Sequence, residues 1–478
     1  MLTKFKKCLY ALYLDMFKNS FYYTFEKLSP KIISVLLLPI LLRLIKPELW
    51  AEITLLLGIQ LLFSYFLTQG DERSILKFTS NNEELQKSFM SLIRYSLMGF
   101  VVIEIVGQIM TNLPFSIIYG LPFRFMFFST VLISVNKLFL AKLRSLEKST
   151  VVFKSSFVEA IFINSFQLIS IAVTVQLDGY DSRVIVSAYF AVQFLGNLIK
   201  FLYYIKQIDF DLIKSPSYIL SKKPDQFLKF SNISFLILLS NYFLNWQDKF
   251  FVEIIFGLKE LGIYSLATRI SNLGMVFISS LLVAAYSKYW PSDLSNSVDN
   301  QVFKVIKDIL SISCFSLCSL MLLVTSVGEY IFPKSYLFSI NLIYLAVLLV
   351  FLQAIVLIFS IDFGRQNKLK KVFFFNLLAF TTQIIGYLYL DLINLSQIFY
   401  VQIITISFFL FIFFYKSFSL YFFKFIQIFL IFSISIFITN SYLNNSVQFL
   451  QIVLFLFGLF LVGLTIQTWI NLDSKSSF

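Results

Sequence analysis

The 478-residue chain contains no histidine. This absence excludes Ser-His-Asp hydrolases and His-dependent acyltransferases, and it removes the usual ligand of zinc and haem sites. A second absence is the G-x-x-x-x-G-K-[ST] phosphate-binding loop, so no ATP hydrolysis through that motif is expected. The three cysteines are too few for a disulfide framework, and Cys314 and Cys318 stand one helical turn apart as packing residues. We predict that the chain is not an enzyme, with no catalytic residues, no cofactor and no metal site.

Charged residues are also scarce, at 14% of the chain, whereas 58% of the residues are hydrophobic and the mean hydropathy is +0.82. These values lie outside the range of soluble proteins. Apolar runs of about 20 residues, the length needed to cross a bilayer, recur along the whole chain. They do not alternate polar and apolar residues as barrel strands do. The sequence therefore predicts an all-α, polytopic membrane protein.

Hydropathy and breaker residues predict about 14 transmembrane helices, with both chain ends on the same side. The segment 1–21 is expected to form an interfacial, amphipathic lead-in and not a signal peptide. The predicted spans are 22–45, 49–69, 88–110, 118–140, 155–177, 184–205, 228–247, 262–285, 303–327, 341–362, 372–391, 397–415, 420–439 and 447–470.

The distribution of Lys and Arg orients these spans. Most basic residues fall in the loops on the side of the N-terminus, which predicts that both termini are cytoplasmic. The basic residues are spread over many loops, so the net charge of +13 does not indicate nucleic-acid binding. The outer segments are short, which argues against a membrane glycan polymerase or ligase. Their only basic residues are Lys46, Arg183, Lys249, Lys259 and Lys334.

Several charged side chains fall inside predicted spans, where each costs at least about 2.5–3.5 kcal/mol without a partner, a wet cavity or access to the interface. Residues near the ends of spans, such as Glu159 and Lys200, are interpreted as interfacial. For several of the other charged residues, a position at the membrane–water interface is an alternative to a position inside the bundle. The charged candidates inside spans are Lys31, Glu52, Arg94, Glu104, Arg124, Lys137, Glu159 and Arg269.

Polar residues recur at helical spacing on several spans. Arg269 shares one stripe with Ser265, Thr268 and Asn272, and the preceding span carries Asn241, Asn245 and Asp248. Two more spans carry Gln60, Ser64 and Thr68, and Asn376 and Gln383. One explanation is interhelical hydrogen bonding, worth about 0.6 kcal/mol per bond. Because several helices share the pattern and one carries an arginine, we favour a water-accessible central cavity.

Four segments resemble one protein family. The stretch D-K-F-F-V-x-I-I-F-G-x-x-x-L-G-I-Y-S-L-A, Asp248 to Ala267, is similar to the link between spans seven and eight of the polysaccharide-biosynthesis (O-antigen) flippase family. That family belongs to the multidrug/oligosaccharidyl-lipid/polysaccharide exporter superfamily. The segments Leu36 to Trp50, Gly70 to Phe78 and Ala141 to Leu146 resemble further family segments. Trp50 and Glu147 depart from the pattern, because the family usually has Gly there.

A weak internal repeat agrees with the same fold, since Glu48-Leu49-Trp50 after span one corresponds to Glu260-Leu261-Gly262 after span seven. The expected architecture is two six-helix lobes with a pseudo-two-fold relation, followed by two further helices. The predicted division is 1–21 as lead-in, 22–205 as the N-terminal lobe, 206–227 as a cytoplasmic linker, 228–415 as the C-terminal lobe, and 416–478 as two extra helices with a tail.

The resemblance implies a flippase in the bacterial plasma membrane that moves a polyprenyl-pyrophosphate-linked oligosaccharide, such as an O-antigen or capsule repeat unit, to the outer leaflet. The implied partners are this lipid-linked glycan, membrane lipid and a glycan polymerase with other assembly proteins. The candidate substrate-binding residues are Arg269, Lys31, Arg94, Arg124, Asn241, Asn245 and Asn272. The candidate residues for H⁺ or Na⁺ coupling are Asp248, Glu52 and Glu104.

Three alternatives remain open. A multidrug or organic-cation antiporter of the same superfamily would line its cavity with acidic residues, a teichoic-acid or other capsule exporter would use the same mechanism, and a membrane-embedded glycan polymerase or ligase would be an enzyme. Asp248 and Lys249 also fit an interfacial pair at a helix end.

Overall fold

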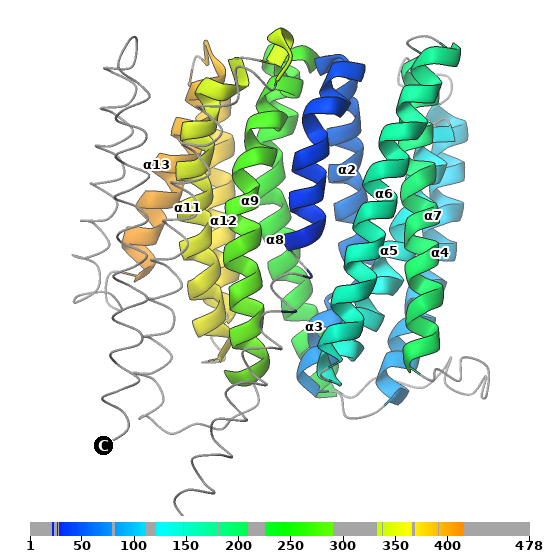
Figure 1. The fold of residues 1–478 in the computed structure, drawn as a ribbon. Coiled ribbons are helices and arrows are strands. Elements are labelled where there is room, and N and C mark those ends of the chain that lie inside the picture. Colours follow the sequence, from blue (N-terminus) through cyan, green and yellow to red (C-terminus); the bar gives the residue numbers. More distant parts are fainter. Residues whose placement is uncertain are drawn as a thin grey trace, which may run out of the picture. The chain divides into compact units, whose positions relative to one another are not determined.

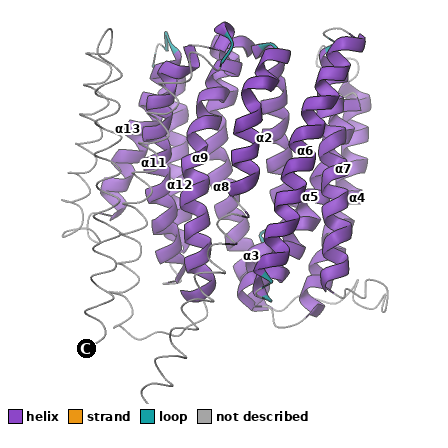
Figure 2. Ribbon diagram, viewed as in Figure 1, coloured by secondary structure: helices purple, strands orange, loops and turns teal. Residues whose placement is uncertain are grey.

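The computed structural model describes residues 22, 26, 28–78, 82–110, 121–146, 148–178, 181–208, 225–289, 332–336, 338–365, 369–390 and 392–414. Every regular element in these ranges is a helix (Figure 2). This confirms the prediction of an all-helical membrane protein. The predicted spans 303–327, 420–439 and 447–470 lie outside the described residues.

Each of the other eleven predicted spans coincides with a helix. Residues 28–44 form the first, which carries no label in Figure 1. The labelled helices are α2 (Pro47–Thr68), α3 (Asp71–Phe78), α4 (Asn82–Met110), α5 (Leu121–Ser145), α6 (Ser149–Asp178), α7 (Ser182–Ile208), α8 (Asp225–Phe256), α9 (Leu258–Tyr289), α11 (Phe338–Arg365), α12 (Leu369–Tyr389) and α13 (Leu395–Phe414), with a short 3₁₀ helix at Lys334–Tyr336.

Six of these helices are long and apolar enough to cross a membrane, counted over the described part of the chain. They are α2, α5, α6, α7, α8 and the segment Lys370–Tyr389 of α12. Leu345–Leu357 and Leu395–Leu410 are shorter apolar segments. At two helix ends, the backbone turns into the left-handed region, with positive φ values. After α2, Gln69 and Gly70 have φ values of 47° and 75°, and Gly257 separates α8 from α9 with a φ of 89°.

The chain divides into two compact units. The first unit takes Met1–Gly262, Ser280–Ser292 and Asn367–Asn376, and the second takes Ile263–Ser279, Asp293–Gln366 and Leu377–Phe478. In the first unit, α5 packs against α2, α3, α4, α6 and α7. In the second unit, α11 packs against α13, and the rings of Tyr264 and Phe399 stack with their centroids 4.7 Å apart.

The two copies of the internal repeat use different side chains at their third position. A Cβ on Gly262 would lie 2.1 Å from the carbonyl oxygen of Pro47, so only glycine allows this approach. Trp50, its counterpart in the repeat, is instead 1% exposed and fills space in the core. The tight backbone approach is therefore made by one copy only. Glu147, the other departure from the family pattern, lies outside the described residues.

Candidate functional site

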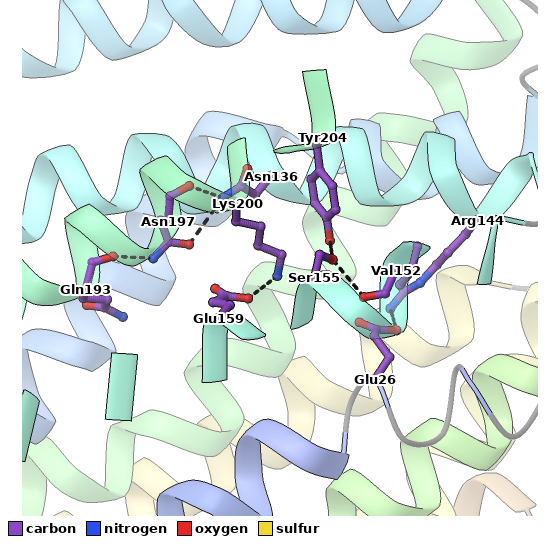
Figure 3. Close-up of polar contacts among 10 residues, drawn as sticks. All are labelled: Glu26, Asn136, Arg144, Val152, Ser155, Glu159, Gln193, Asn197, Lys200 and Tyr204. Carbon is purple, nitrogen blue, oxygen red and sulfur yellow. Dashed lines mark hydrogen bonds and ion pairs between the residues drawn. The ribbon is translucent and has the colours of Figure 1, made fainter. Parts of the chain in front are cut away.

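A stripe of polar residues runs along α7 and meets partners on α5 and α6 (Figure 3). It also meets a partner on α2. The stripe consists of Gln193, Asn197, Lys200 and Tyr204, spaced four, three and four residues apart, so all four side chains share one face. It is not among the polar stripes predicted above, although its spacing is visible in the sequence.

Lys200 forms an ion pair with Glu159 of α6, and each side chain is mostly buried. One turn further along, the hydroxyl oxygens of Tyr204 and Ser155 lie 3.0 Å apart in a hydrogen bond. The interfacial interpretation of Glu159 and Lys200 did not include a direct pair. The pair is possible because α6 and α7 pack together and bring the two side chains to the same level.

Amides continue this network toward α2 and α5. The side chains of Gln60 and Gln193 donate to each other at 3.2 Å, and Gln60 also donates to Ser129 at 3.3 Å. Asn136 of α5 donates to the backbone carbonyl of Asn197 at 2.9 Å. The presence of Gln60 within a span is therefore explained by interhelical hydrogen bonds, which were the alternative to a water-accessible cavity. The network holds α2, α5, α6 and α7 together.

An arginine lies near each end of α5. Near the C-terminal end, the guanidinium of Arg144 lies 2.6 Å from the carboxylate of Glu26. Arg124, near the beginning of α5, is exposed. The contact of Arg144 ties the residues that precede the helix at 28–44 to α5.

Lys137 lies in the C-terminal half of α5, and its environment differs from those of Arg124 and Arg144. Its ammonium group donates to the hydroxyl of Ser64 at 2.7 Å and lies 5.1 Å from the ring centroid of Tyr65, both on α2. Among the described residues, no carboxylate lies within ion-pair distance of Lys137. A cation in a hydroxyl and aromatic environment retains the capacity to bind an anion. Lys137 was one of the charged candidates of the sequence but was not placed in the predicted site.

The polar residues of the predicted stripe on α8 make contacts within that helix and with α12. Asn376 of α12 donates to the side-chain oxygen of Asn241 at 2.7 Å, and Asn245 donates to the backbone carbonyl of Asn241 at 2.7 Å. Lys249 lies 3.5 Å from the carboxylate of Asp248 and 4.5 Å from the ring centroid of Trp246. Asp248 and Lys249 are both buried in the protein. Their burial differs from the alternative of an interfacial pair at a helix end, since α8 continues to Phe256.

The remaining predicted residues differ in their exposure. Lys31, Arg94, Arg124 and Asn272 are exposed. Glu52 on α2 and Arg269 on α9 are half-buried, whereas Glu104 lies in α4 with a side chain outside the described part. Arg269 and Asn272 belong to the second unit, and the other candidates belong to the first.

The described residues hold no group of three or more His, Cys, Asp and Glu side chains placed to bind a metal ion. The polar groups on these helices are ammonium, guanidinium, hydroxyl, amide and carboxylate groups, which can bind polar or ionic ligands.

The sequence matches the family model described as polysaccharide biosynthesis protein over residues 16–286. The chain belongs to this family. No curated protein matches the sequence. The resemblance drawn from the sequence is thus confirmed over the segment that contains all four quoted motifs.

Solved transporters of the MOP superfamily share the fold of this chain. A structure from Pyrococcus furiosus, described as "Reverse polarity of binding pocket suggests different function of a MOP superfamily transporter", matches with a TM-score of 0.58 at 13% identity, over 84% of this chain and 94% of that chain. A MATE protein in complex with MaL6 matches with a TM-score of 0.55 at 13% identity, with the same coverage. An outward-facing multidrug resistance MATE transporter matches with a TM-score of 0.52, also at 13% identity and with the same coverage. The chain therefore has the fold of a MOP superfamily transporter.

Proposed function

We propose that this protein is a flippase that moves a polyprenyl-pyrophosphate-linked oligosaccharide from the cytoplasmic leaflet to the outer leaflet of a bacterial plasma membrane. The family supplies the link to polysaccharide synthesis, and the superfamily fold supplies a transporter. Alternating access then exposes one polar site to each side in turn. The lipid tail stays in the bilayer while the glycan and pyrophosphate cross through the protein.

The observation that carries this proposal is the environment of Lys137. A positive charge inside a span is costly unless a partner compensates it. Lys200 has such a partner in Glu159, and Lys249 lies beside Asp248. Lys137 directly contacts only the neutral groups of Ser64 and Tyr65 among the described residues, and the carboxylate of Glu72 interacts with it from beyond ion-pair distance. An anionic ligand such as a pyrophosphate would complete its coordination.

The residues predicted from the sequence keep their roles within this proposal. Basic residues, Arg269 above all, hold the pyrophosphate, because the guanidinium fork binds two oxygens at once. Amides on α8 and α9 bind sugar hydroxyls. Coupling to H⁺ or Na⁺ is assigned to Asp248, Glu52 and Glu104. The amide and basic candidates besides Arg269 are Lys31, Arg94, Arg124, Asn241, Asn245 and Asn272.

A multidrug or organic-cation antiporter is the second candidate, because the MATE structures have the same fold. For the Pyrococcus furiosus transporter, the reverse polarity of the binding pocket suggests a different function. Polarity therefore provides the criterion that separates the two candidates. Here Lys137, which has no carboxylate at ion-pair distance in the described part of the chain, favours an anionic substrate.

Deletion of the gene tests both candidates. A flippase predicts loss of the surface glycan, with its lipid-linked precursor retained on the cytoplasmic face of the membrane. Wild-type protein supplied in trans should restore the glycan. Unchanged surface glycan together with new sensitivity to cationic dyes would reject the flippase and support the antiporter.

A further inference from the structure

The segment Gly70 to Phe78, one of the four segments that resemble the family, forms the end of the turn after α2 and all of α3. Gly70 has a φ of 75°, and a Cβ on it would lie 2.5 Å from the backbone oxygen of Ser231, so the turn requires glycine. The carboxylate of Asp71 lies 2.8 Å from the hydroxyl of Ser231 on α8. These contacts fix the direction in which α3 begins, and with it the position of Glu72, its second residue.

Glu72 lies within electrostatic range of Lys137 on α5 and of Tyr65 on α2. This position follows from the packing of α3 against α5. The carboxylate of Glu72 and the ammonium group of Lys137 lie beyond ion-pair distance of each other. One carboxylate oxygen, Oε2, is buried and accepts no hydrogen bond from the described residues. Because burial removes the hydration of this oxygen without replacing it, Oε2 is an acceptor that a ligand with a donor would satisfy.

Three more groups surround the ring of Tyr65. The hydroxyl of Tyr242 is buried without a hydrogen-bond partner among the described residues, and the two tyrosine rings have centroids 6.5 Å apart. The ammonium group of Lys137 lies 5.1 Å from the Tyr65 centroid, and the guanidinium of Arg73 interacts electrostatically with the same tyrosine. We name Tyr65, Glu72, Arg73, Lys137 and Tyr242 the Tyr65 cluster. All five residues belong to the first unit.

The Tyr65 cluster sets a donor and an acceptor side by side, and this limits the ligands that it fits. The ammonium group of Lys137 has three N–H donors, of which Ser64 accepts one. The other donors suit the oxygens of a pyrophosphate. The carboxylate of Glu72 only accepts hydrogen bonds, so it repels further anionic oxygens and attracts a hydroxyl or an amide N–H. A matching ligand therefore carries anionic oxygens with a hydrogen-bond donor next to them.

The carrier lipid meets this requirement only when it is glycosylated. A sugar attached to the pyrophosphate brings hydroxyl or amide donors close to the phosphate oxygens. Without the sugar, a further ionisable oxygen takes its place, and the terminal phosphate carries more negative charge. That charge would lie near the carboxylate of Glu72, whose buried oxygen would remain unpaired. A site of this kind discriminates strongly, because the wrong ligand meets both a repulsion and an unsatisfied polar group.

We infer that Glu72 is a specificity-determining residue, which accepts a hydrogen bond from the sugar attached to the pyrophosphate and disfavours the carrier lipid without a sugar. This inference rests on the proposed function, because that function makes the pyrophosphate the ligand of Lys137. Its consequence is that the bare carrier lipid in the membrane does not occupy the protein.

Binding to purified full-length protein in lipid nanodiscs tests the role of Glu72. The two probes are a polyprenyl pyrophosphate without sugar and the polyprenyl-pyrophosphate-linked glycan purified from the cells that produce it. We expect the wild-type protein to bind the glycosylated lipid at least about tenfold more tightly than the bare lipid. Glu72→Ala should lose most of this preference.

The second variant, Glu72→Gln, keeps the size of the side chain and removes its charge. We expect it to bind the bare lipid at least about threefold more tightly than the wild-type protein does, because the repulsion is gone. Misfolding lowers binding, so it cannot produce this gain. Glu48→Gln is the matched control, because Glu48 is an exposed carboxylate at the beginning of α2, and its affinities should equal those of the wild-type protein.

Two results would overturn the role of Glu72 and leave the proposed function intact. One is a wild-type protein that binds both lipids equally well, and the other is a Glu72→Gln variant that binds the bare lipid no better than the Glu48→Gln control. If the wild-type protein binds neither lipid, the proposed function fails, and the inference fails with it.

Discussion

Lys200 on α7 and Glu159 on α6 form an ion pair within the first unit. The pair joins α6 and α7, which are also joined by the hydrogen bond between Tyr204 and Ser155, and it belongs to the polar stripe of α7 (Figure 3). Removing one partner leaves the other charge uncompensated among apolar side chains, whereas removing both does not.

We therefore expect Glu159→Gln and Lys200→Met each to lower thermal stability in detergent more than the double variant does. The coupling energy from the double-mutant cycle should be about 0.5–3 kcal/mol, the range for residues in contact. Thermal unfolding followed by size-exclusion chromatography measures all four proteins. Additive effects of the two substitutions would contradict a stabilising ion pair.

Lys137→Met should reduce glycan export at least about tenfold without loss of protein from the membrane. A hydrogen bond to a charged group is worth about 1.5–3 kcal/mol, and about 1.4 kcal/mol corresponds to a factor of ten. Lys154→Met is the matched control, because Lys154 is an exposed lysine on α6. Export by the Lys137 variant at the level of the control would remove Lys137 from the site.

Arg269→Ala should abolish glycan export while the protein still inserts into the membrane, because the guanidinium of Arg269 is proposed to bind the pyrophosphate. Lys259→Ala, which removes an exposed cation near the beginning of the same helix, should export normally. Surface glycan and membrane protein level are measured together. Arg269 has no part in substrate binding if the two variants export equally well.

Gly262→Ala should destabilise the protein by about 1–3 kcal/mol, the usual cost of overpacking. The added Cβ would lie 2.1 Å from the backbone oxygen of Pro47, which cannot move aside as a side chain could. Gly99→Ala is the control, because its Cβ would meet the ring of Phe127 at an ordinary 3.6 Å. Similar unfolding temperatures for the two variants would show that the approach of Gly262 to Pro47 is not tight.

The helices of this protein follow from hydropathy alone, because a bilayer leaves few ways to satisfy the backbone. The predicted spans 49–69 and 184–205 lie close to the observed ends of α2 and α7, whereas α5 extends beyond the predicted span 118–140 to Ser145. The site was harder to predict, since helical spacing places polar residues on one face but not opposite a given partner. Gln60 was recognised as part of a stripe, yet its contact with Gln193 joins residues 133 positions apart.

The sequence by itself determined that the chain is a helical membrane protein without histidine chemistry, and its motifs determined the family. The tertiary structure decided which charges are compensated. Glu159 and Lys200 are 41 residues apart and become partners only when α6 packs on α7, whereas Lys137 meets Ser64 and the ring of Tyr65. The physical reason is that the cost of a charge within a span depends on the neighbouring atoms in space, and helix packing sets those neighbours.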